Sequence, residues 1–345
     1  MTDIMQQITL AARPAGAPKA SDFALIERPL PELAEGEVLV KLHAFSLDPY
    51  MRGRMDDAKS YAAPVPIGGV MEAGGVGEVI ASRSAGFVVG DIAFGMFGWA
   101  THGCLPAREL RKLDSPLPAT TALGVLGMPG FTGWYGLTEL GRPKAGETLV
   151  VAAATGPVGS MVGQIAKARG LRTVAIAGGA EKCTLALEKF GFDAAIDHRA
   201  HADARSLRAA LAEAAPKGID IYFENVGGKV FEAVLPLMNT FGRIPVCGMI
   251  SGYNAGALGG VEAQGPDKLP LLWRSILVKQ MSVNGFIISN HFEHYPAFIA
   301  EVAPLVATGK LAYLEDIADG LANAPAAFMG MLEGKNTGKQ IVRLG

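Results

Sequence analysis

The sequence predicts an α/β protein that combines a doubly wound, six-stranded parallel sheet with a second, mostly antiparallel and barrel-like β domain. Two observations predict the sheet. Apolar strands alternate with helical segments about every twenty residues after Glu147, and a glycine-rich turn follows the first of these strands. A third observation predicts the β domain, because short β-branched runs separated by glycine and proline clusters fill the chain from Gln7 to Asp114.

The first domain is predicted from runs such as Glu37–Leu42 and Gly77–Ile80, in which apolar and polar residues alternate or β-branched residues gather. After Pro118 the pattern becomes helical. We therefore expect a β domain over residues 1–128, a nucleotide-binding domain over 129–311 and a C-terminal segment over 312–345. This segment ends in the strand-like run Lys339–Leu344, which we expect to rejoin the first domain.

The second domain has the six strands of a full dinucleotide-binding sheet. They are predicted at Thr148–Ala153, Thr173–Ala177, Ala194–Asp197, Ile219–Phe223, Gly242–Cys247 and Ser282–Ile288. The intervening helices are predicted at Val158–Arg169, Glu181–Lys189, Asp203–Ala214, Lys229–Met238 and Leu269–Val278. A last helix, Phe292–Ala307, leads out of the domain.

Composition narrows the class of partner. The net charge is −2, with 31 basic and 33 acidic residues mixed along the chain, so no basic face is available for nucleic acid or anionic lipid. Three widely separated cysteines are typical of reduced thiols in the cytosol. The first thirty residues lack a signal-like apolar run, and no stretch reaches the ~20 apolar residues of a membrane helix. We expect a soluble, cytoplasmic protein that binds small molecules or copies of itself.

The segment Val150–Gly163 runs from a buried strand through a tight turn into a helix. Amides at a helix start, at the positive end of its dipole, suit a pyrophosphate. Gly156 and Gly159 remove side chains where a phosphate approaches, and Gly163 lets the helix lie close to the strand. Ala154 replaces the first glycine of the usual GxGxxG pattern, so the surrounding α/β order is what predicts a dinucleotide site.

The end of the second strand indicates which dinucleotide is bound. Sites for NAD usually place an acidic residue there to hold the ribose 2′-hydroxyl. Here Gly178 and Gly179 occupy the strand end, and Lys182 follows one helical turn later, where its charge can pair with a 2′-phosphate. NADPH is therefore favoured; the alternative is that Lys182 is an ordinary solvated lysine beside Glu181.

Seven ordered motifs resemble the zinc-independent medium-chain dehydrogenase/reductase family, in its group of prostaglandin, 2-alkenal and curcumin reductases. They are Leu47–Met55, Gly127–Gly130, the glycine loop, Ala177–Cys183, Tyr222–Gly228, Arg243–Gly248 and Gly334–Lys339. The resemblance covers nearly the whole chain. It implies a GroES-like β domain, a Rossmann domain and a homodimer whose sixth strands meet edge to edge.

The resemblance also implies the cofactor-binding residues. Lys182 binds the 2′-phosphate, Asn225 lies on the cofactor, and Asn336 returns from the tail. His198 stands where many relatives have a tyrosine, and its imidazole can also donate. The full expected set is Thr155, Gly156, Pro157, Val158, Gly159, Gly179, Lys182, His198, Asn225, Cys247, Gly248, Ile250, Ser251, Tyr253, Phe286, Ile287, Ile288 and Asn336.

We expect no metal site. Zinc-dependent members of the wider family have a cysteine in the loop that reads Leu47–Tyr50 here and a histidine in the stretch Pro66–Glu72, and this chain has neither. Two histidine pairs at three-residue spacing, His198/His201 and His291/His294, have no cysteine beside them. Histidines on the surface or at helix starts explain both pairs.

A site that offers a hydride donor and weak hydrogen-bond donors suits the reduction of an α,β-unsaturated carbonyl compound. Hydride would reach the β-carbon, and negative charge would collect on the carbonyl oxygen, where a donor stabilises it. Tyr253 is the leading donor, because a phenol stays protonated at neutral pH; the nicotinamide ribose hydroxyl or water can share the role. Tyr50 is expected to bind substrate or line the pocket. The alternatives are packing over the nicotinamide for Tyr253 and a loop-edge position for Tyr50.

Two other functions remain open from the residues alone. A quinone reductase shares the fold, the cofactor and the absence of zinc, and a non-enzymatic NADPH-binding protein would keep the same fold. Substrate is expected near Gly127–Gly133, where one domain leads into the next. Met128, Trp99, Phe131 and Trp134 would supply apolar walls unless they are core residues, and the glycine-rich run Ala255–Gly260 is expected to be mobile near the mouth.

Overall fold

The computed structural model describes residues 4–255 and 268–345, which form two compact units. The first unit contains the chain up to Gly127, a short segment that begins at Tyr253, and the tail from Glu315. The second unit begins at Met128 and contains the chain to Gly252 and a later part that ends at Leu314. The run Ala255–Gly260 lies outside the described residues except for Ala255.

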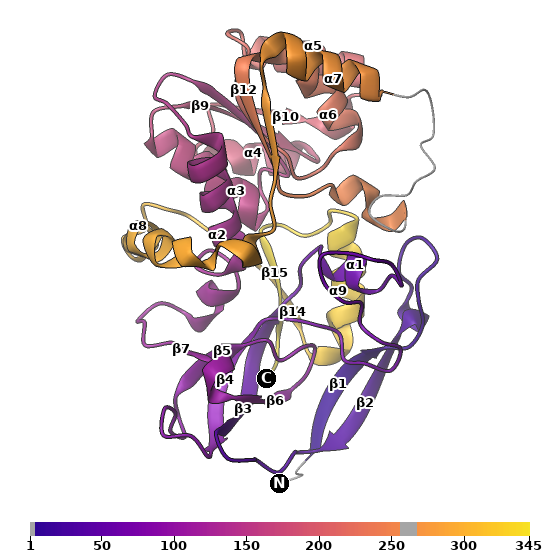
Figure 1. Ribbon diagram of the computed structural model, residues 1–345, viewed down its shortest axis with the longest axis vertical. Coiled ribbons are helices and arrows are strands. Elements are labelled where there is room, and N and C mark those ends of the chain that lie inside the picture. The colour runs from indigo at the N-terminus through magenta and orange to yellow at the C-terminus, as the bar shows by residue number, and fades with distance from the viewer. Residues whose placement is uncertain (1–3, 256–267) are drawn as a thin grey trace. The chain divides into compact units, whose positions relative to one another are not determined.

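The second unit contains the predicted six-stranded parallel sheet (Figure 1). Its strands lie in the order β10-β9-β8-β11-β12-β13 and span Ala194–Asp197, Arg172–Ala177, Thr148–Ala152, Ile219–Phe223, Met238–Val246 and Ser282–Gly285. All five residues of β8 are buried, as expected for a parallel strand covered on both faces. The strand order reverses between β8 and β11, which is where a doubly wound sheet binds its ligand.

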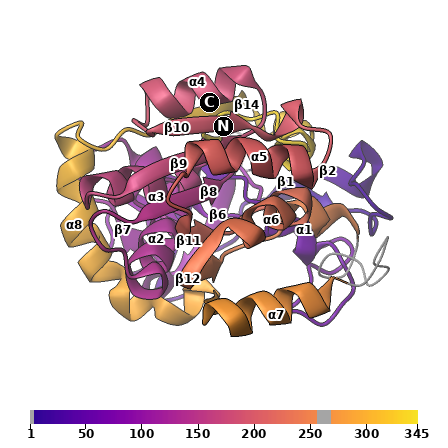
Figure 2. The ribbon, with the colours of Figure 1, turned by 90° about the horizontal axis from the view of Figure 1, so that it is seen from above.

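Helices cover both faces of this sheet (Figure 2). They are α2 (Met128–Tyr135), α3 (Pro157–Ala168), α4 (Ala180–Glu188), α5 (Ala204–Ala214), α6 (Gly228–Val234), α7 (Leu269–Lys279) and α8 (Tyr295–Ala307). One core cluster packs Val150 and Ile176 of the sheet against Leu207 and Leu211 of α5. The predicted strands and helices are confirmed to within a few residues, because each is a local apolar pattern ended by glycine, proline or a polar cap.

Three predicted boundaries are wrong. The sixth strand ends at Gly285, and a 3₁₀ turn over Ile288–His294 follows, so Phe286–Ile288 have left the sheet. The helix predicted to reach Met238 ends at Val234, where a 3₁₀ turn that contains Pro236 begins. Strand β12 begins at Met238, before the predicted Gly242, because its pairing with β11 contains an irregularity near Ile219 that sequence periodicity does not show.

The first unit is mostly antiparallel, as predicted. Its main sheet runs β14-β15-β3-β4-β5-β7, with β6 also paired to β3, and β1 pairs with β2 in a separate two-stranded sheet. The strands span Ile4–Leu10, Phe23–Pro29, Glu37–Ser46, Gly75–Ser82, Ile92–Gly95, His102–Pro106, Arg111–Lys112, Glu315–Asp319 and Lys339–Arg343 (β1 to β7, β14 and β15); the helices are α1 (Met51–Arg54) and α9 (Ala324–Leu332).

The C-terminal strand rejoins the first unit. Strand β15 pairs antiparallel with β3, with Ile341 opposite Ser46 and Arg343 opposite Ala44. This confirms the prediction for the tail. Lys339, at the start of β15, is buried, and its Nζ donates to the Leu47 carbonyl oxygen at 2.6 Å and to the Asp48 carboxylate at 2.8 Å. A buried lysine needs such partners, since an unpaired charge in the interior is costly.

Trp99, Phe131 and Trp134 are core residues and do not form an apolar binding wall. Trp99 is fully buried in the first unit, where it stacks on Phe23 at a centroid distance of 5.5 Å. Phe131 and Trp134 lie buried in α2, and the Trp134 indole donates to Glu301 at 2.7 Å. Large aromatic side chains bury the most apolar area, so they contribute strongly to a protein core. Met128, the fourth predicted wall residue, is half-buried.

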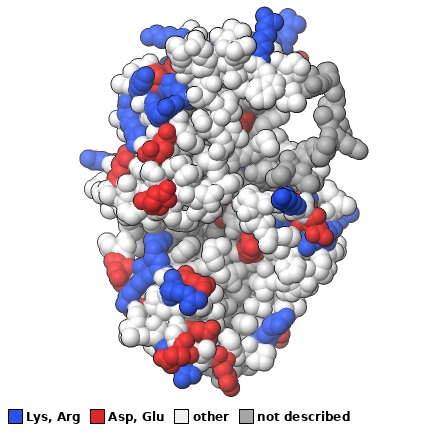
Figure 3. Space-filling view, viewed as in Figure 1, with Lys and Arg blue, Asp and Glu red and all other residues white. Residues whose placement is uncertain are grey.

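The surface and helix lengths add two observations. On the face shown in Figure 3, acidic and basic side chains are interspersed and separated by uncharged surface. Within residues 4–255 and 268–345, no helix is both long and apolar enough to span a bilayer.

Candidate functional site

The turn between β8 and α3 has the geometry of a phosphate-binding loop. Ala153 adopts a left-handed φ of 51°, which turns the chain sharply at the strand end, and Gly156 caps the first turn of α3. Thr155 is buried beside it, and Pro157 occupies the first helical position, where no amide hydrogen is needed. The free amide groups of this first turn and the helix dipole provide a site for an anion.

Gly159 and Gly163 serve packing. A Cβ atom on Gly159 would lie 2.4 Å from the Ala153 carbonyl oxygen, so glycine lets the helix pack against its own turn. A Cβ atom on Gly163 would lie 2.0 Å from the ring of Phe192. The nearest atoms belong to an aromatic side chain, a neighbour that sequence spacing does not identify, and the closeness of helix and strand at Gly163 stays a prediction. Gly156 leaves more room, since its nearest such contact would be 3.3 Å.

A basic cluster surrounds the turn at the end of β9. Gly179 has a φ of +104°, a conformation that favours glycine, and caps α4. A Cβ atom on Gly178 would meet Arg199 Nε at 2.9 Å and His198 Nε2 at 3.1 Å, so both side chains lie over this turn. The Asp197 carboxylate accepts from the backbone amides of Gly179 and Arg199, each at 2.8 Å. It thereby joins the ends of β9 and β10.

The charges that act on His198 identify the other members of this cluster. Burial lowers the pKa of His198, and the positive charges of Lys229, Arg199 and Lys182 lower it further, against the opposite effect of Asp197. Lys229 Nζ donates to the carbonyl oxygens of His198 and His201, at 2.9 and 2.6 Å. Three permanent cations therefore act on one imidazole, an arrangement suited to a dianion.

Of this cluster, only Lys182 and His198 were predicted from the sequence. The signal for Arg199 was its position directly after His198 at the end of the third strand. Lys229 had no signal, because it starts α6 on a different part of the chain and reaches the cluster only in the folded protein.

The loop after β11 places Asn225 beside the phosphate loop. Asn225 Nδ2 donates to the Ala152 carbonyl oxygen at 2.8 Å. Two consecutive glycines with positive φ, Gly227 at 77° and Gly228 at 54°, then turn the chain into α6. Most other residues would be strained at these angles.

The loop after β12 lies against the β11 loop. The Cys247 and Gly248 amides donate to the Glu224 carbonyl oxygen, and Ile250 and Ser251 donate to the next two carbonyl groups along that loop. Burial raises the pKa of Cys247 to about 12, so its thiol stays protonated and is a poor nucleophile. The loop leads into the 3₁₀ segment Ile250–Ala255, which carries Tyr253.

The segment after β13 is half-buried, and it contains the predicted residues Phe286, Ile287 and Ile288. The Phe286 ring lies 5.6 Å from that of Tyr135, and a Cβ atom on Gly136 would be 2.9 Å from it. Four loops that follow parallel strands, after β8, β9, β11 and β12, thus carry most of the predicted cofactor residues in one unit.

Tyr50, Tyr253 and Asn336 belong to the first unit. Tyr50 precedes α1; burial raises its pKa, as do the nearby Asp48 and Glu72 carboxylates, and Arg54 lies 5.6 Å from its ring centroid. Asn336 Nδ2 donates to the Gly338 carbonyl oxygen at 2.9 Å. The structure therefore places Tyr50 in a desolvated environment, in which its hydroxyl remains a hydrogen-bond donor.

No group of three or more histidine, cysteine, aspartate or glutamate side chains suited to a metal ion occurs among the described residues.

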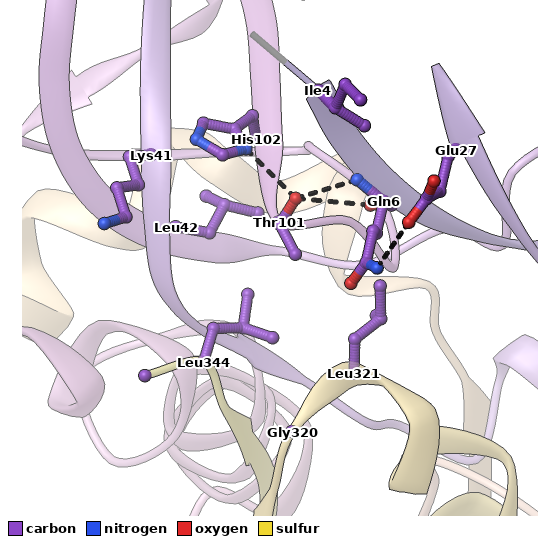
Figure 4. Close-up of a pocket in the computed structure, with 11 residues that line it drawn as sticks. Ile4, Gln6, Glu27, Lys41, Leu42, Thr101, His102, Gly320, Leu321 and Leu344 are labelled. Carbon is purple, nitrogen blue, oxygen red and sulfur yellow. Dashed lines mark hydrogen bonds between the residues drawn. The ribbon is translucent and has the colours of Figure 1, made fainter. Parts of the chain in front are cut away.

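A pocket of about 600 Å³ lies in the first unit (Figure 4). Its polar residues include Gln6 and His102 on either side of Thr101, whose hydroxyl lies within hydrogen-bond distance of both. It contains no residue of the predicted site.

Comparisons with known proteins give one consistent result. A family model described as the N-terminal domain of oxidoreductase matches residues 6–113, and one described as zinc-binding dehydrogenase matches residues 157–304. The chain is 52% identical to the NADPH-dependent curcumin reductase of Escherichia coli, over 97% of this chain and 95% of that protein. It is 40% identical to a 2-alkenal reductase (NADP⁺-dependent) of Nicotiana tabacum, over 98% and 96%.

A solved structure agrees with these relatives. The crystal structure of CurA from Vibrio vulnificus in complex with NADPH superposes with a TM-score of 0.92 at 50% sequence identity, and the match covers 99% of both chains.

Proposed function

Because this chain belongs to the medium-chain dehydrogenase/reductase family, we propose that it reduces the carbon–carbon double bond of α,β-unsaturated aldehydes and ketones with NADPH. The observation that carries the proposal is the basic cluster at the end of β9. Lys182, His198 and Arg199 gather where a site for NAD would have an acidic side chain, so the cluster fits a ribose 2′-phosphate.

The residues present fit NADPH along its length. Residues Thr155–Gly159 would surround the pyrophosphate, with the Val158 and Gly159 amides as donors, and the basic cluster would hold the 2′-phosphate. Asn225 and the loop Cys247–Ser251 would hold the nicotinamide half, together with Phe286–Ile288 and, from the tail, Asn336. When bound, NADPH supplies a hydride to the β-carbon of the substrate.

The protein's own contribution to the reaction is a hydrogen-bond donor for the carbonyl oxygen. Tyr253 is proposed for this role, because a phenolic hydroxyl can stabilise negative charge that develops on that oxygen. Tyr50 is proposed to line the substrate pocket, where its raised pKa keeps the hydroxyl protonated. Protonation of the α-carbon can come from water or from Tyr253.

The test is turnover by the purified protein. Loss of absorbance of the reduced nicotinamide is followed with NADPH or NADH and a panel of 2-alkenals, longer enones and quinones, with and without a chelator. Chelator-resistant oxidation of NADPH by enones is the expected result. Activity with quinones alone would replace the proposal with a quinone reductase, and no activity with any acceptor would make the chain a non-enzymatic NADPH-binding protein.

The role of Tyr253 needs its own variant. Tyr253→Phe keeps the ring and removes the hydroxyl, so kcat is expected to fall by about 10² while the KM for NADPH stays unchanged, as when one donor to a developing oxyanion is lost. An unchanged kcat would assign Tyr253 to packing.

The protein is also proposed to form a homodimer through β13 and α7. Strand β13 is an end strand of the described sheet, with β12 as its one neighbour. Five apolar side chains of α7 are more than half exposed: Leu269, Leu271, Trp273, Leu277 and Val278. Exposed apolar side chains concentrated on one helix are typical of an interface. A second copy would cover them and pair the two edge strands.

The cytoplasm is the proposed compartment. Cys104, Cys183 and Cys247 are all free thiols in the structure. Free thiols persist where the environment is reducing.

A further inference from the structure

Glu224, a buried carboxylate outside the predicted site, lies at the junction of three cofactor loops. It follows β11, and its side chain is 3% exposed. Its backbone amide donates to the Pro245 carbonyl oxygen at 3.0 Å, and its own carbonyl oxygen accepts from Cys247 at 2.9 Å and Gly248 at 3.2 Å. The residue therefore joins the ends of β11 and β12 through its main chain.

The side chain holds the turn that follows. Glu224 Oε1 accepts from the Val226 amide at 2.6 Å and the Gly227 amide at 2.8 Å. The hydroxyl of Tyr222, which is fully buried, also donates to Oε1 at 3.0 Å. One oxygen thus satisfies three donors, two of which belong to the backbone that enters the positive-φ glycine pair Gly227–Gly228.

That turn in turn positions the two groups proposed for the nicotinamide half of NADPH. Between Glu224 and Gly227 lies Asn225, whose amide reaches the Ala152 carbonyl oxygen at the end of β8. The Val226 carbonyl oxygen accepts from the Ser251 amide at 3.1 Å and the Ser251 hydroxyl at 2.5 Å. Movement of the turn would therefore shift both Asn225 and the loop Cys247–Ser251.

The other carboxylate oxygen is unusual. Glu224 Oε2 is buried and has no hydrogen-bond partner among the described residues. Burial raises the pKa of Glu224, against the opposite effect of the Val226 and Gly227 amides. A buried polar atom without a partner costs stability, so the hold of Oε1 on the turn is retained at a cost.

We propose that Glu224 is a positioning residue for hydride transfer, whose Oε1 holds the 225–228 turn and, through it, the 247–251 loop in the shape that receives the nicotinamide ring. The inference rests on the proposed function for the identity of the cofactor. It predicts that losing the carboxyl group disturbs the nicotinamide half of the site more than the adenine half, because Oε1 binds the Val226 and Gly227 amides after β11, whereas Lys182 and Arg199 follow β9 and β10.

The test compares Glu224→Ala with Glu224→Gln, which keeps an oxygen at the Oε1 position and matches the carboxyl group in size. Affinities for NADPH and for 2′,5′-ADP, which carries the adenine half alone, are measured by calorimetry, and kcat is measured with an enone. For Glu224→Ala, kcat/KM for NADPH is expected to fall about tenfold or more, because two backbone donors lose their acceptor. The affinity for 2′,5′-ADP is expected to fall clearly less, since Lys229 alone of the basic cluster follows the 225–228 turn. Glu224→Gln is expected to recover most of the loss.

Glu315→Ala is the matched control, since Glu315 is a glutamate of the first unit whose Oε1 is likewise buried without a partner. It is expected to lower the melting temperature without changing either affinity. Equal losses of affinity for NADPH and for 2′,5′-ADP in a folded Glu224→Ala variant would leave the residue with a general structural role only. Kinetics of that variant identical to those of the wild type would also overturn the proposal. If the wild type binds NADPH but reduces no enone, the proposed reaction fails while the comparison of the two affinities still decides the role of Glu224.

Discussion

Arg199 and Lys182 supply permanent charge beside the Gly178–Gly179 turn, so they are expected to determine cofactor choice. Replacing Arg199 by Leu should raise the KM for NADPH about tenfold or more, because a charge-assisted hydrogen bond contributes ~1.5–3 kcal/mol. The KM for NADH should not change, since NADH lacks the 2′-phosphate. Steady-state kinetics with both cofactors measure the effect.

The control for this prediction is Arg205→Leu, because Arg205 is an exposed arginine near the start of α5. It should leave both KM values unchanged. An equal rise for NADH in Arg199→Leu would show that Arg199 supports the loop and does not read the phosphate.

His198 should make stability depend on pH in a defined direction. Burial, followed by the charges of Lys229 and Arg199, lowers its pKa below the ordinary 6.5 in the folded protein. Folding therefore displaces a proton from this ring at acid pH, and stability is lost as the pH falls below 6.5. In His198→Asn that loss disappears, so the melting temperature of the variant relative to wild type should rise as the pH is lowered from about 7.5 to about 5.

Bound cofactor should reduce the pH-dependent difference in melting temperature between His198→Asn and the wild type. A 2′-phosphate next to His198 stabilises the protonated ring, so saturating NADP⁺ raises the pKa of His198 again. Thermal denaturation of both proteins with and without NADP⁺ tests the point. A difference that does not depend on pH would mean that His198 titrates alike in the folded and unfolded chains.

At the scale of elements, the close approach of α3 to the end of β8 depends on Gly159. An alanine Cβ there would lie 2.4 Å from the Ala153 carbonyl oxygen and 2.7 Å from Ala154 Cα, and backbone atoms cannot move aside as a side-chain tip can. Gly159→Ala should therefore displace the start of α3, lower the free energy of unfolding by ~1–3 kcal/mol and weaken NADPH binding. Denaturant unfolding and calorimetry measure the two effects.

Gly156→Ala gives the comparison at the same loop. Its added Cβ would have a nearest contact of 3.3 Å, so the stability loss should be clearly smaller than for Gly159→Ala. Similar losses for both variants would mean that the loop relaxes as a whole and that close packing at Gly159 does not limit it.

At the scale of the whole molecule, the exposed apolar face of α7 is expected to hold two copies together. Leu277 is 78% exposed in the single chain, and Leu277→Lys would place a charge in the proposed interface. Light scattering after size exclusion should give twice 36.0 kDa for the wild type and 36.0 kDa for the variant. Leu187→Lys, at an exposed leucine of α4, should remain dimeric. A wild-type monomer would reject the interface.

The sequence by itself determined the order of elements and the phosphate loop. Strands β10 and β11 coincide with the predicted Ala194–Asp197 and Ile219–Phe223, and the turn of Gly156 and Gly159 lies where the glycine spacing predicts. These features depend on residues a few positions apart, so apolar periodicity, helix caps and glycine conformations are sufficient to predict them. The same local reasoning pointed to Lys182, whereas Asn225 followed from the resemblance to the family.

Only the tertiary structure decided which distant residues meet. Lys339 pairs with Asp48 across 291 residues, Phe192 fills the space left by Gly163, and Arg199 lies over Gly178. The same holds for Glu224, whose carboxylate holds the 225–228 turn that packs against the 247–251 loop. No periodicity encodes such contacts, because they depend on which strands become neighbours in each sheet and on how far each buried side chain must reach for a partner.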